Sequence, residues 1–102
     1  MRVVFNGETI AQSVDAITLR EGDYSPMFYI PRGDVRTEVL QSTNHSTHCP
    51  FKGDASYWTV TVGGKTSDNA VWSYELPFDE VAEIKDHMAF YPNRMDEIAV
   101  EA

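Results

Sequence analysis

The densest group of reactive side chains in the chain lies in one short segment, residues 47–57. This segment holds an imidazole at His48, a thiol at Cys49, an amine at Lys52 and a phenol at Tyr57. Such groups act as general acids or bases, as nucleophiles and as ligands for anions. A proline and a glycine between them predict a bend, and a bent loop that leads into a strand is a common place for a site, because the sheet holds what the loop presents.

A Cys-His nucleophilic pair is the first chemistry to consider for this segment. The thiolate is the nucleophile in such a pair, and a nearby imidazolium favours the thiolate. Neighbouring residues of an extended chain point to opposite sides, so His48 is expected to face away from Cys49. We therefore expect Cys49 to be a packed, structural thiol and treat a nucleophilic role as the less favoured alternative.

Zinc is the second chemistry, since His45, His48, Cys49 and His87 are suitable ligands. A structural zinc site needs four ligands in a closed tetrahedron, and these usually arrive as two closely spaced pairs. The chain has one cysteine and no second closely spaced Cys or His pair. We therefore expect no bound metal and no cofactor.

An anion pocket is the third chemistry. Lys52 is followed by a glycine, which places a cation beside a backbone that a ligand can approach closely. Arg32, Arg36 and His48 are candidates to converge on it from the preceding turn. The pattern is not a Walker loop, which needs two spaced glycines before a Lys-Ser/Thr pair. Tyr57 lies on the more polar face of its predicted strand, where small neighbours would leave room for a ligand.

Composition limits the partners of the chain. Sixteen acidic residues stand against eight basic ones, which gives a formal net charge of −8. This charge repels phosphate backbones at long range, so we expect no nucleic-acid partner. No apolar run approaches the roughly 20 residues of a membrane helix, and we expect no membrane partner. A single cysteine and the early polar residues, which argue against a secretory signal, predict a cytoplasmic protein.

The elements that must position the reactive segment are predicted to be short strands. The Asn-Gly pair at residues 6–7 predicts a type I′ hairpin, because both central residues of that turn need a positive φ. A second hairpin turn is expected at residues 63–64, after the clearest strand of the chain. The predicted strands cover residues 3–5, 8–11, 16–20, 27–30, 55–62, 71–74, 88–91 and 98–100.

Strand 55–62 has two different faces, with Trp58, Val60 and Val62 on one and Tyr57 on the other. Other segments predict less regular structure. Residues 22–26 are turn material, residues 41–47 read as a polar loop, and residues 79–85 are the best helix candidate. Residues 35–40 fit a helical turn and a strand equally well, and both remain open.

The run at residues 48–57 (HCPFKGDASY) resembles the central signature of the bacterial DUF427 family, and the run is highly specific. Flanking segments fit as well, among them residues 29–31, 70–74 and 89–91, so the resemblance covers essentially the whole chain. The family is similar to the Mss4-like, or β-tent, folds, in which two β-sheets lean together around a cleft. The resemblance implies a mainly β fold of two small antiparallel sheets with one or two short helices, in a single domain over residues 1–102.

The resemblance implies a fold more than an activity, since the function of the family is unassigned. Some relatives of the β-tent fold hold zinc between two Cys-x-x-Cys pairs, which this chain lacks. The family is sometimes labelled nucleotidyltransferase-like, but the chain has no Gly-Ser turn followed by a paired-aspartate metal motif. The signature positions carried over are Tyr29, Pro31, Asp34, His48, Cys49, Lys52, Gly53, Tyr57, Trp72 and Tyr91.

The leading hypothesis is a binding module whose cleft holds a small polar or anionic molecule. Lys52 and His48 would contact the ligand, with Tyr57 and Trp72 as walls. The expected ligand-binding residues are Tyr29, Arg32, His48, Lys52, Tyr57 and Trp72.

The alternative is a small enzyme in which His48 is the acid or base, since histidine titrates near neutral pH. Lys52 would stabilise developing negative charge and Asp34 would orient a partner group, which makes these three the expected catalytic residues. A third class is a protein-interaction module that uses exposed sheet edges. The sequence leaves the oligomeric state open.

Overall fold

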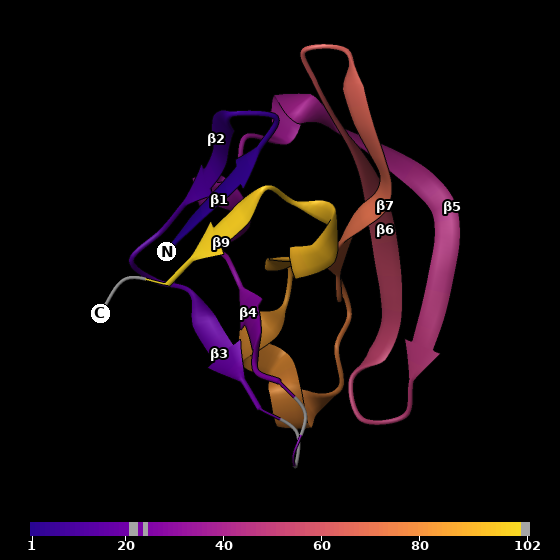
Figure 1. Cartoon of the computed structure of the whole chain (residues 1–102). Helices are drawn as coiled ribbons and strands as arrows, with labels where there is room; N and C mark the ends of the chain where they lie inside the picture. Colours follow the sequence, from indigo (N-terminus) through magenta and orange to yellow (C-terminus); the bar gives the residue numbers. More distant parts are fainter. Residues whose placement is uncertain (21–22, 24, 101–102) are drawn as a thin grey trace.

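Figure 1 shows the computed structural model of the chain, in which residues 1–20, 23 and 25–100 are described. The regular elements of this part are strands and 3-10 turns. The strands are β1 (Arg2–Phe5), β2 (Glu8–Gln12), β3 (Ile17–Leu19), β4 (Met27–Tyr29), β5 (Leu40–Cys49), β6 (Gly53–Val62), β7 (Lys65–Ser73), β8 (Met88–Phe90) and β9 (Glu97–Ala99). The turns are η1 (Arg32–Asp34), η2 (Thr37–Val39), η3 (Asp79–Ile84) and η4 (Pro92–Arg94). No helix in the described residues is long and apolar enough to cross a membrane.

All the strand pairs in the described residues are antiparallel, and they form three sheets. The largest has the order β5-β6-β7-β8, a second has the order β2-β1-β9, and the third is the pair β3-β4. The long β6–β7 hairpin rises on one side of the molecule, with β5 curving beside it (Figure 1). The mainly β, antiparallel class is thus confirmed, with three sheets in place of the two expected.

The hairpin predicted from the Asn-Gly pair is confirmed. Asn6 and Gly7 have φ angles of 49° and 79°, and the turn sets Phe5 opposite Glu8 in the β1–β2 ladder. The Asn6 side-chain amide also donates a hydrogen bond of 2.8 Å to the carbonyl of Val62, which ties this turn to the end of β6. The second predicted turn joins β6 to β7.

The loop predicted at residues 41–47 is wrong, because these residues belong to strand β5. Its backbone pairs with β6 from Leu40 opposite Val60 to Cys49 opposite Gly53, with an irregularity between Ser42 and Ser46. The strand is polar because it is the edge of its sheet and most of its side chains are exposed. The polar composition therefore reflects exposure and not the absence of a partner strand.

The short helix predicted at residues 79–85 is present only as 3-10 turns, η3. Its regularity breaks at Val81, whose φ and ψ are −128° and 29°, while Ile84 is fully buried. Residues 35–40 fitted a helical turn and a strand equally well, and both occur: the segment contains the 3-10 turn η2 and ends at the first residue of β5. The turn predicted at residues 22–26 includes positions 22 and 24, which lie outside the described residues.

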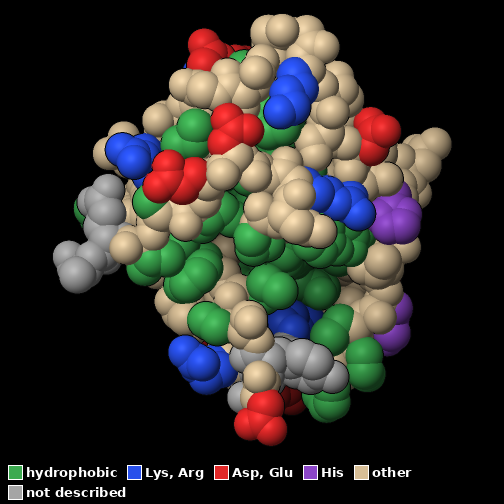
Figure 2. Space-filling model, viewed as in Figure 1, with side chains coloured by type: hydrophobic (Ala, Val, Ile, Leu, Met, Phe, Trp, Pro, Cys, Tyr) green, Lys and Arg blue, Asp and Glu red, His purple; other side chains and the backbone are tan. Residues whose placement is uncertain are grey.

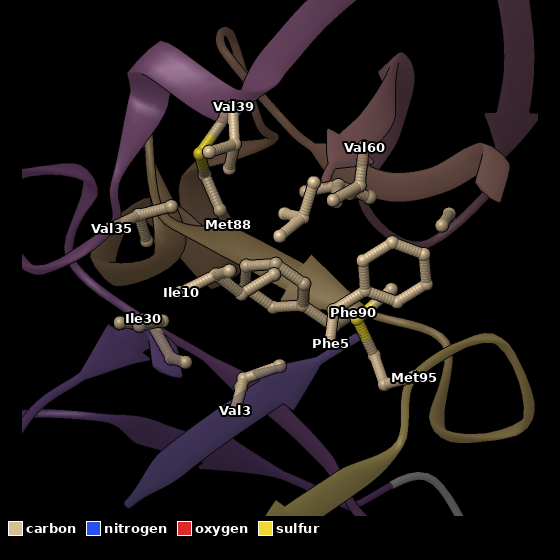
Figure 3. Close-up of a cluster of buried hydrophobic side chains, with 14 of the residues drawn as sticks. Val3, Phe5, Ile10, Ile30, Val35, Val39, Val60, Met88, Phe90 and Met95 are labelled. Atoms are coloured by element: carbon tan, nitrogen blue, oxygen red, sulfur yellow. The ribbon is translucent and has the colours of Figure 1, made fainter. Parts of the chain in front are cut away.

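Each face of the four-stranded sheet carries its own cluster of buried side chains. Figure 3 shows the first cluster, which is largely aliphatic and includes Val60, Met88 and Phe90. The second cluster is largely aromatic and includes Tyr29, Ala55, Tyr57, Trp72, Tyr74, Ile84 and Ala89. Val60 and Val62 belong to the first cluster and Tyr57 to the second, which confirms the two faces predicted for this strand.

Candidate functional site

The aromatic face of the sheet borders a cavity of about 510 Å³. This volume lies within the range of about 300–1,000 Å³ that is typical of small-molecule sites. The walls come from β3, β4, β6 and β7, from the β5–β6 turn and from residues that follow β7 and β8. The lining residues are Leu19, Ser25, Met27, Tyr29, Lys52, Tyr57, Trp72, Tyr74 and Tyr91. Hydrophobic side chains also gather across the middle of the face seen in Figure 2.

The aromatic side chains of the cavity pack on one another around Trp72. Tyr57 stands opposite Trp72 in the β6–β7 ladder, so their side chains emerge on the same face. The Tyr91 ring lies 4.5 Å from the Trp72 ring at an angle of 41°. The Tyr29 ring meets Trp72 edge-on at 6.3 Å, and the indole nitrogen donates a hydrogen bond of 3.4 Å to the Tyr29 hydroxyl. These contacts pack Tyr29, Trp72 and Tyr91 against one another as one aromatic wall of the cavity.

A short chain of hydroxyl groups runs along this wall. The Tyr57 hydroxyl lies 3.0 Å from Oγ1 of Thr47 and 3.3 Å from the Tyr91 hydroxyl. Burial, reinforced by the hydrogen bond to Tyr57, raises the pKa of Tyr91 to about 12. Burial also raises the pKa of Tyr29 and of Tyr74 above the ordinary value for tyrosine. At neutral pH these phenols keep their protons and can donate hydrogen bonds to a ligand.

Lys52 is the basic residue of the cavity, and only 8% of its surface is exposed. The turn between β5 and β6 positions it: its backbone N–H donates to the Cys49 carbonyl, and its carbonyl accepts from the Phe78 N–H at 2.9 Å. The Nζ atom lies 3.9 Å from Sγ of Cys49. Burial lowers the pKa of Lys52, so its amine gives up a proton more readily than an exposed lysine would.

His48 lies away from this cavity. Its Nδ1 atom is 2.7 Å from a carboxylate oxygen of Asp54, and its side chain is 63% exposed. It borders a separate hollow of about 270 Å³, together with Glu75 and Phe78 among others. Cys49, by contrast, is half-buried and packs against the aromatic cluster. The prediction that His48 and Cys49 face opposite sides of the chain is confirmed.

Asp34 and Arg32 also lie outside the set of residues that line the cavity. The Asp34 carboxylate accepts a hydrogen bond of 2.6 Å from the Ser13 hydroxyl. The Arg32 guanidinium lies 5.1 Å from the centre of the Trp58 ring and 3.8 Å from the Glu75 carboxylate.

Arg36, the further cation expected near Lys52, lies 3.1 Å from Glu38. Of the residues expected to bind a ligand, the structure brings together Tyr29, Lys52, Tyr57 and Trp72. It places Arg32, Asp34 and His48 elsewhere.

Tyr74 and Tyr91 line the cavity, although sequence reasoning assigned them no part in binding. Small neighbours of Tyr57 already predicted room on this face, and a further small residue on β8 adds to that signal. Ala89 stands opposite Trp72 in the β7–β8 ladder, and Ala55 lies two positions before Tyr57 on the same face. Such small residues beside large aromatic ones leave room over the sheet. Within the described residues, no three or more His, Cys, Asp or Glu side chains gather as a metal site would require.

The fold and the site together define a small antiparallel β-domain with a lysine held in an aromatic-walled cavity. The sequence model of DUF427, a domain of unknown function, matches residues 1–101. The chain therefore belongs to the DUF427 family, as the resemblance predicted. A search of curated proteins finds no match for the chain.

Proposed function

We propose that this domain binds a small, planar, anionic molecule in the aromatic cavity, with the ammonium group of Lys52 next to its acidic group. The observation that carries the proposal is a lysine only 8% exposed among Tyr29, Tyr57 and Trp72. Aromatic walls offer flat apolar surface to a ring, and protonated phenols offer donors to oxygen atoms. A ligand that has both a ring and an acidic group matches this set of contacts.

The charge of the whole chain limits the kind of anion that fits. The net charge of −8 repels anions at long range, but salt screens exposed charges beyond about 10 Å. A cation in a partly buried site acts at short range with less screening. The proposal is therefore a small molecule that enters the cavity, and not an extended polyanion on the surface.

The enzyme alternative built on His48 has less support, because His48 and Lys52 border different hollows. In that mechanism His48 as acid or base and Lys52 as the charge-stabilising group would both have to contact the same substrate. The Asp54 carboxylate orients the His48 ring instead on the exposed side of the β5–β6 hairpin.

A matched set of ligands tests the proposal. Benzoate has a ring and a charge, benzamide keeps the planar ring without the charge, and cyclohexanecarboxylate keeps the charge without the planar ring. Titration followed by NMR should give saturable shifts at the Trp72 indole and the Tyr57 backbone that are largest with benzoate. Lys52→Met should abolish the response, whereas Lys85→Met, at an exposed position, should keep it. Equal responses of these two variants, or no saturable response to any anion, would refute the proposal.

A further inference from the structure

Lys52 differs from the other two lysines of the chain in its surroundings. Lys65 has a side chain that is 58% exposed, and Lys85 is exposed as well. Lys52 is only 8% exposed and lines the cavity. A lysine amine is a nucleophile only in its neutral form, and desolvation in an apolar pocket is one way in which proteins obtain that form. The burial of Lys52 acts in this direction by lowering its pKa.

The cavity also supplies the proton donors that carbonyl chemistry needs. The addition of an amine to an aldehyde requires a proton for the carbonyl oxygen and a second one for the departing water. Tyr29, Tyr74 and Tyr91 line the same cavity as Lys52, and burial keeps their phenols protonated. Nucleophile and acids thus face one space that is large enough for an aromatic ring.

We propose that Lys52 condenses with an aromatic aldehyde in this cavity to form an imine. The inference rests on the proposed function in one respect, since both need a planar ligand to enter the cavity. It adds a covalent step at Lys52.

The step balances without an oxidant or a reductant. The lone pair of Nζ forms a bond to the carbonyl carbon, and the carbonyl π electrons move to the oxygen, which takes up a proton while the nitrogen loses one. The hydroxyl of this carbinolamine takes a second proton from a cavity phenol and leaves as water as the C=N bond forms. Loss of the remaining nitrogen proton restores the phenol through solvent, and the net change is amine plus aldehyde to imine plus water.

The two roles of Lys52 belong to its two protonation states. The ammonium form attracts a carboxylate, whereas the neutral amine attacks an aldehyde. A bound carboxylate should therefore protect Lys52 from the aldehyde. This competition links the covalent step to the cavity and not to a general reactivity of lysines.

Reductive trapping of the full chain tests the proposal. Benzaldehyde and sodium cyanoborohydride convert an imine to a stable benzylamine, which peptide mass spectrometry locates. We expect Lys52 to carry more label than Lys65 and Lys85 in the same molecules. The neutral fraction of an amine, and with it the rate of labelling, rises about tenfold for each pH unit by which its pKa is lowered. Benzoate should suppress the label on Lys52 alone, and unfolding in urea should remove the preference.

Equal labelling of the three lysines in the folded protein, or preferential labelling that benzoate leaves unchanged, overturns the proposal. The two proposals can fail separately. Saturable binding of benzoate without preferential labelling of Lys52 overturns the covalent step and leaves the proposed function standing. Preferential labelling of Lys52 with no benzoate binding and no protection overturns both, because the reactive amine would then lie outside a ligand site.

Discussion

The hydroxyl of Tyr57 on β6 lies 3.3 Å from the hydroxyl of Tyr91, which follows β8, although β7 separates the two strands in the sheet. The same Tyr57 hydroxyl lies 3.0 Å from Oγ1 of Thr47 on β5. The Tyr57 phenol thus connects β5, β6 and the residue that follows β8 on the cavity side of the four-stranded sheet. The link makes the wall of the cavity and the stability of the sheet depend on the same side chains.

The Tyr57 hydroxyl should therefore contribute more to stability than the Tyr91 hydroxyl. Tyr57→Phe removes two hydrogen bonds and Tyr91→Phe removes one, and each is worth about 1 kcal/mol. We expect losses in the free energy of unfolding of about 2 and about 1 kcal/mol respectively, measured by urea denaturation. The double variant should lose less than the sum of the two, because both single changes break the same bond. An additive double variant would mean that the two hydroxyls do not interact.

Alkaline pH should destabilise the domain through its cavity phenols. A phenol with a higher pKa in the folded chain than in the unfolded chain keeps its proton longer when folded. The unfolded chain then holds fewer protons above pH 10, the ordinary value for tyrosine, and stability falls as the pH rises towards 12. Tyr91→Phe should make this fall shallower between pH 10 and 12. Unfolding free energies across that range give the slope, and an unchanged slope would contradict the raised pKa of Tyr91.

Lys52 should produce a pH dependence of the opposite sign. Because its pKa is lowered by burial, the unfolded chain binds more protons than the folded chain between that lowered value and 10.5. Its contribution to stability therefore rises with pH through this window. The stability of Lys52→Met relative to the wild type should fall as the pH increases from neutrality to 10.5. The comparison at each pH cancels the titration of the tyrosines, and a constant difference would show that Lys52 is not desolvated.

Gly53, the one glycine of the reactive segment, should be costly to replace. Its φ of +113° lies in a region that L-residues rarely adopt, at a cost of about 1–3 kcal/mol. An added Cβ would lie 3.4 Å from the Leu76 carbonyl oxygen, an ordinary contact, so the cost comes from the backbone. Gly53→Ala should lower the free energy of unfolding by about this amount. Gly33→Ala is the control, because nothing lies within 4 Å of its added Cβ, and we expect a change within about 0.5 kcal/mol.

Local signals predicted the parts of the fold that depend on local physics. The Asn6-Gly7 turn needs two positive φ angles, and the alternation of residues 55–62 follows from the geometry of a strand. Strand β5 was missed because an edge strand exposes most of its side chains, and its polar residues then look like those of a loop. The sequence predicts a helix where the structure has the 3-10 turns of η3, because acidic and basic ends favour any helical turn and do not fix its length.

Prediction of the candidate site required contacts between residues far apart in the sequence, and local sequence patterns do not contain these contacts. Strand alternation separated His48 from Cys49 correctly, but it could not show that the turn carries Lys52 back to the Cys49 side. Asp34 and Ser13 meet although 21 positions separate them in the chain. The aromatic cavity could be inferred only in part. Tyr29, Lys52, Tyr57 and Trp72 were predicted to bind a ligand and line the cavity, whereas Tyr91 was carried over only as a signature position of the family.

The separation of His48 from Lys52 leads to the sharpest prediction about the site. His48→Ala removes an imidazole that pairs with Asp54 on the exposed side of the hairpin, and exposed pairs contribute at most about 1 kcal/mol to stability. The variant should fold and should bind benzoate with the affinity of the wild type, whereas Lys52→Met should lose binding. Both substitutions lie in the same reactive segment, His48 near the end of β5 and Lys52 in the turn that follows, so a general disturbance of this segment would weaken both variants alike. Parallel NMR titrations of the two variants decide the matter, and a loss of affinity in His48→Ala equal to that in Lys52→Met would mean that the ligand spans both sides of the hairpin.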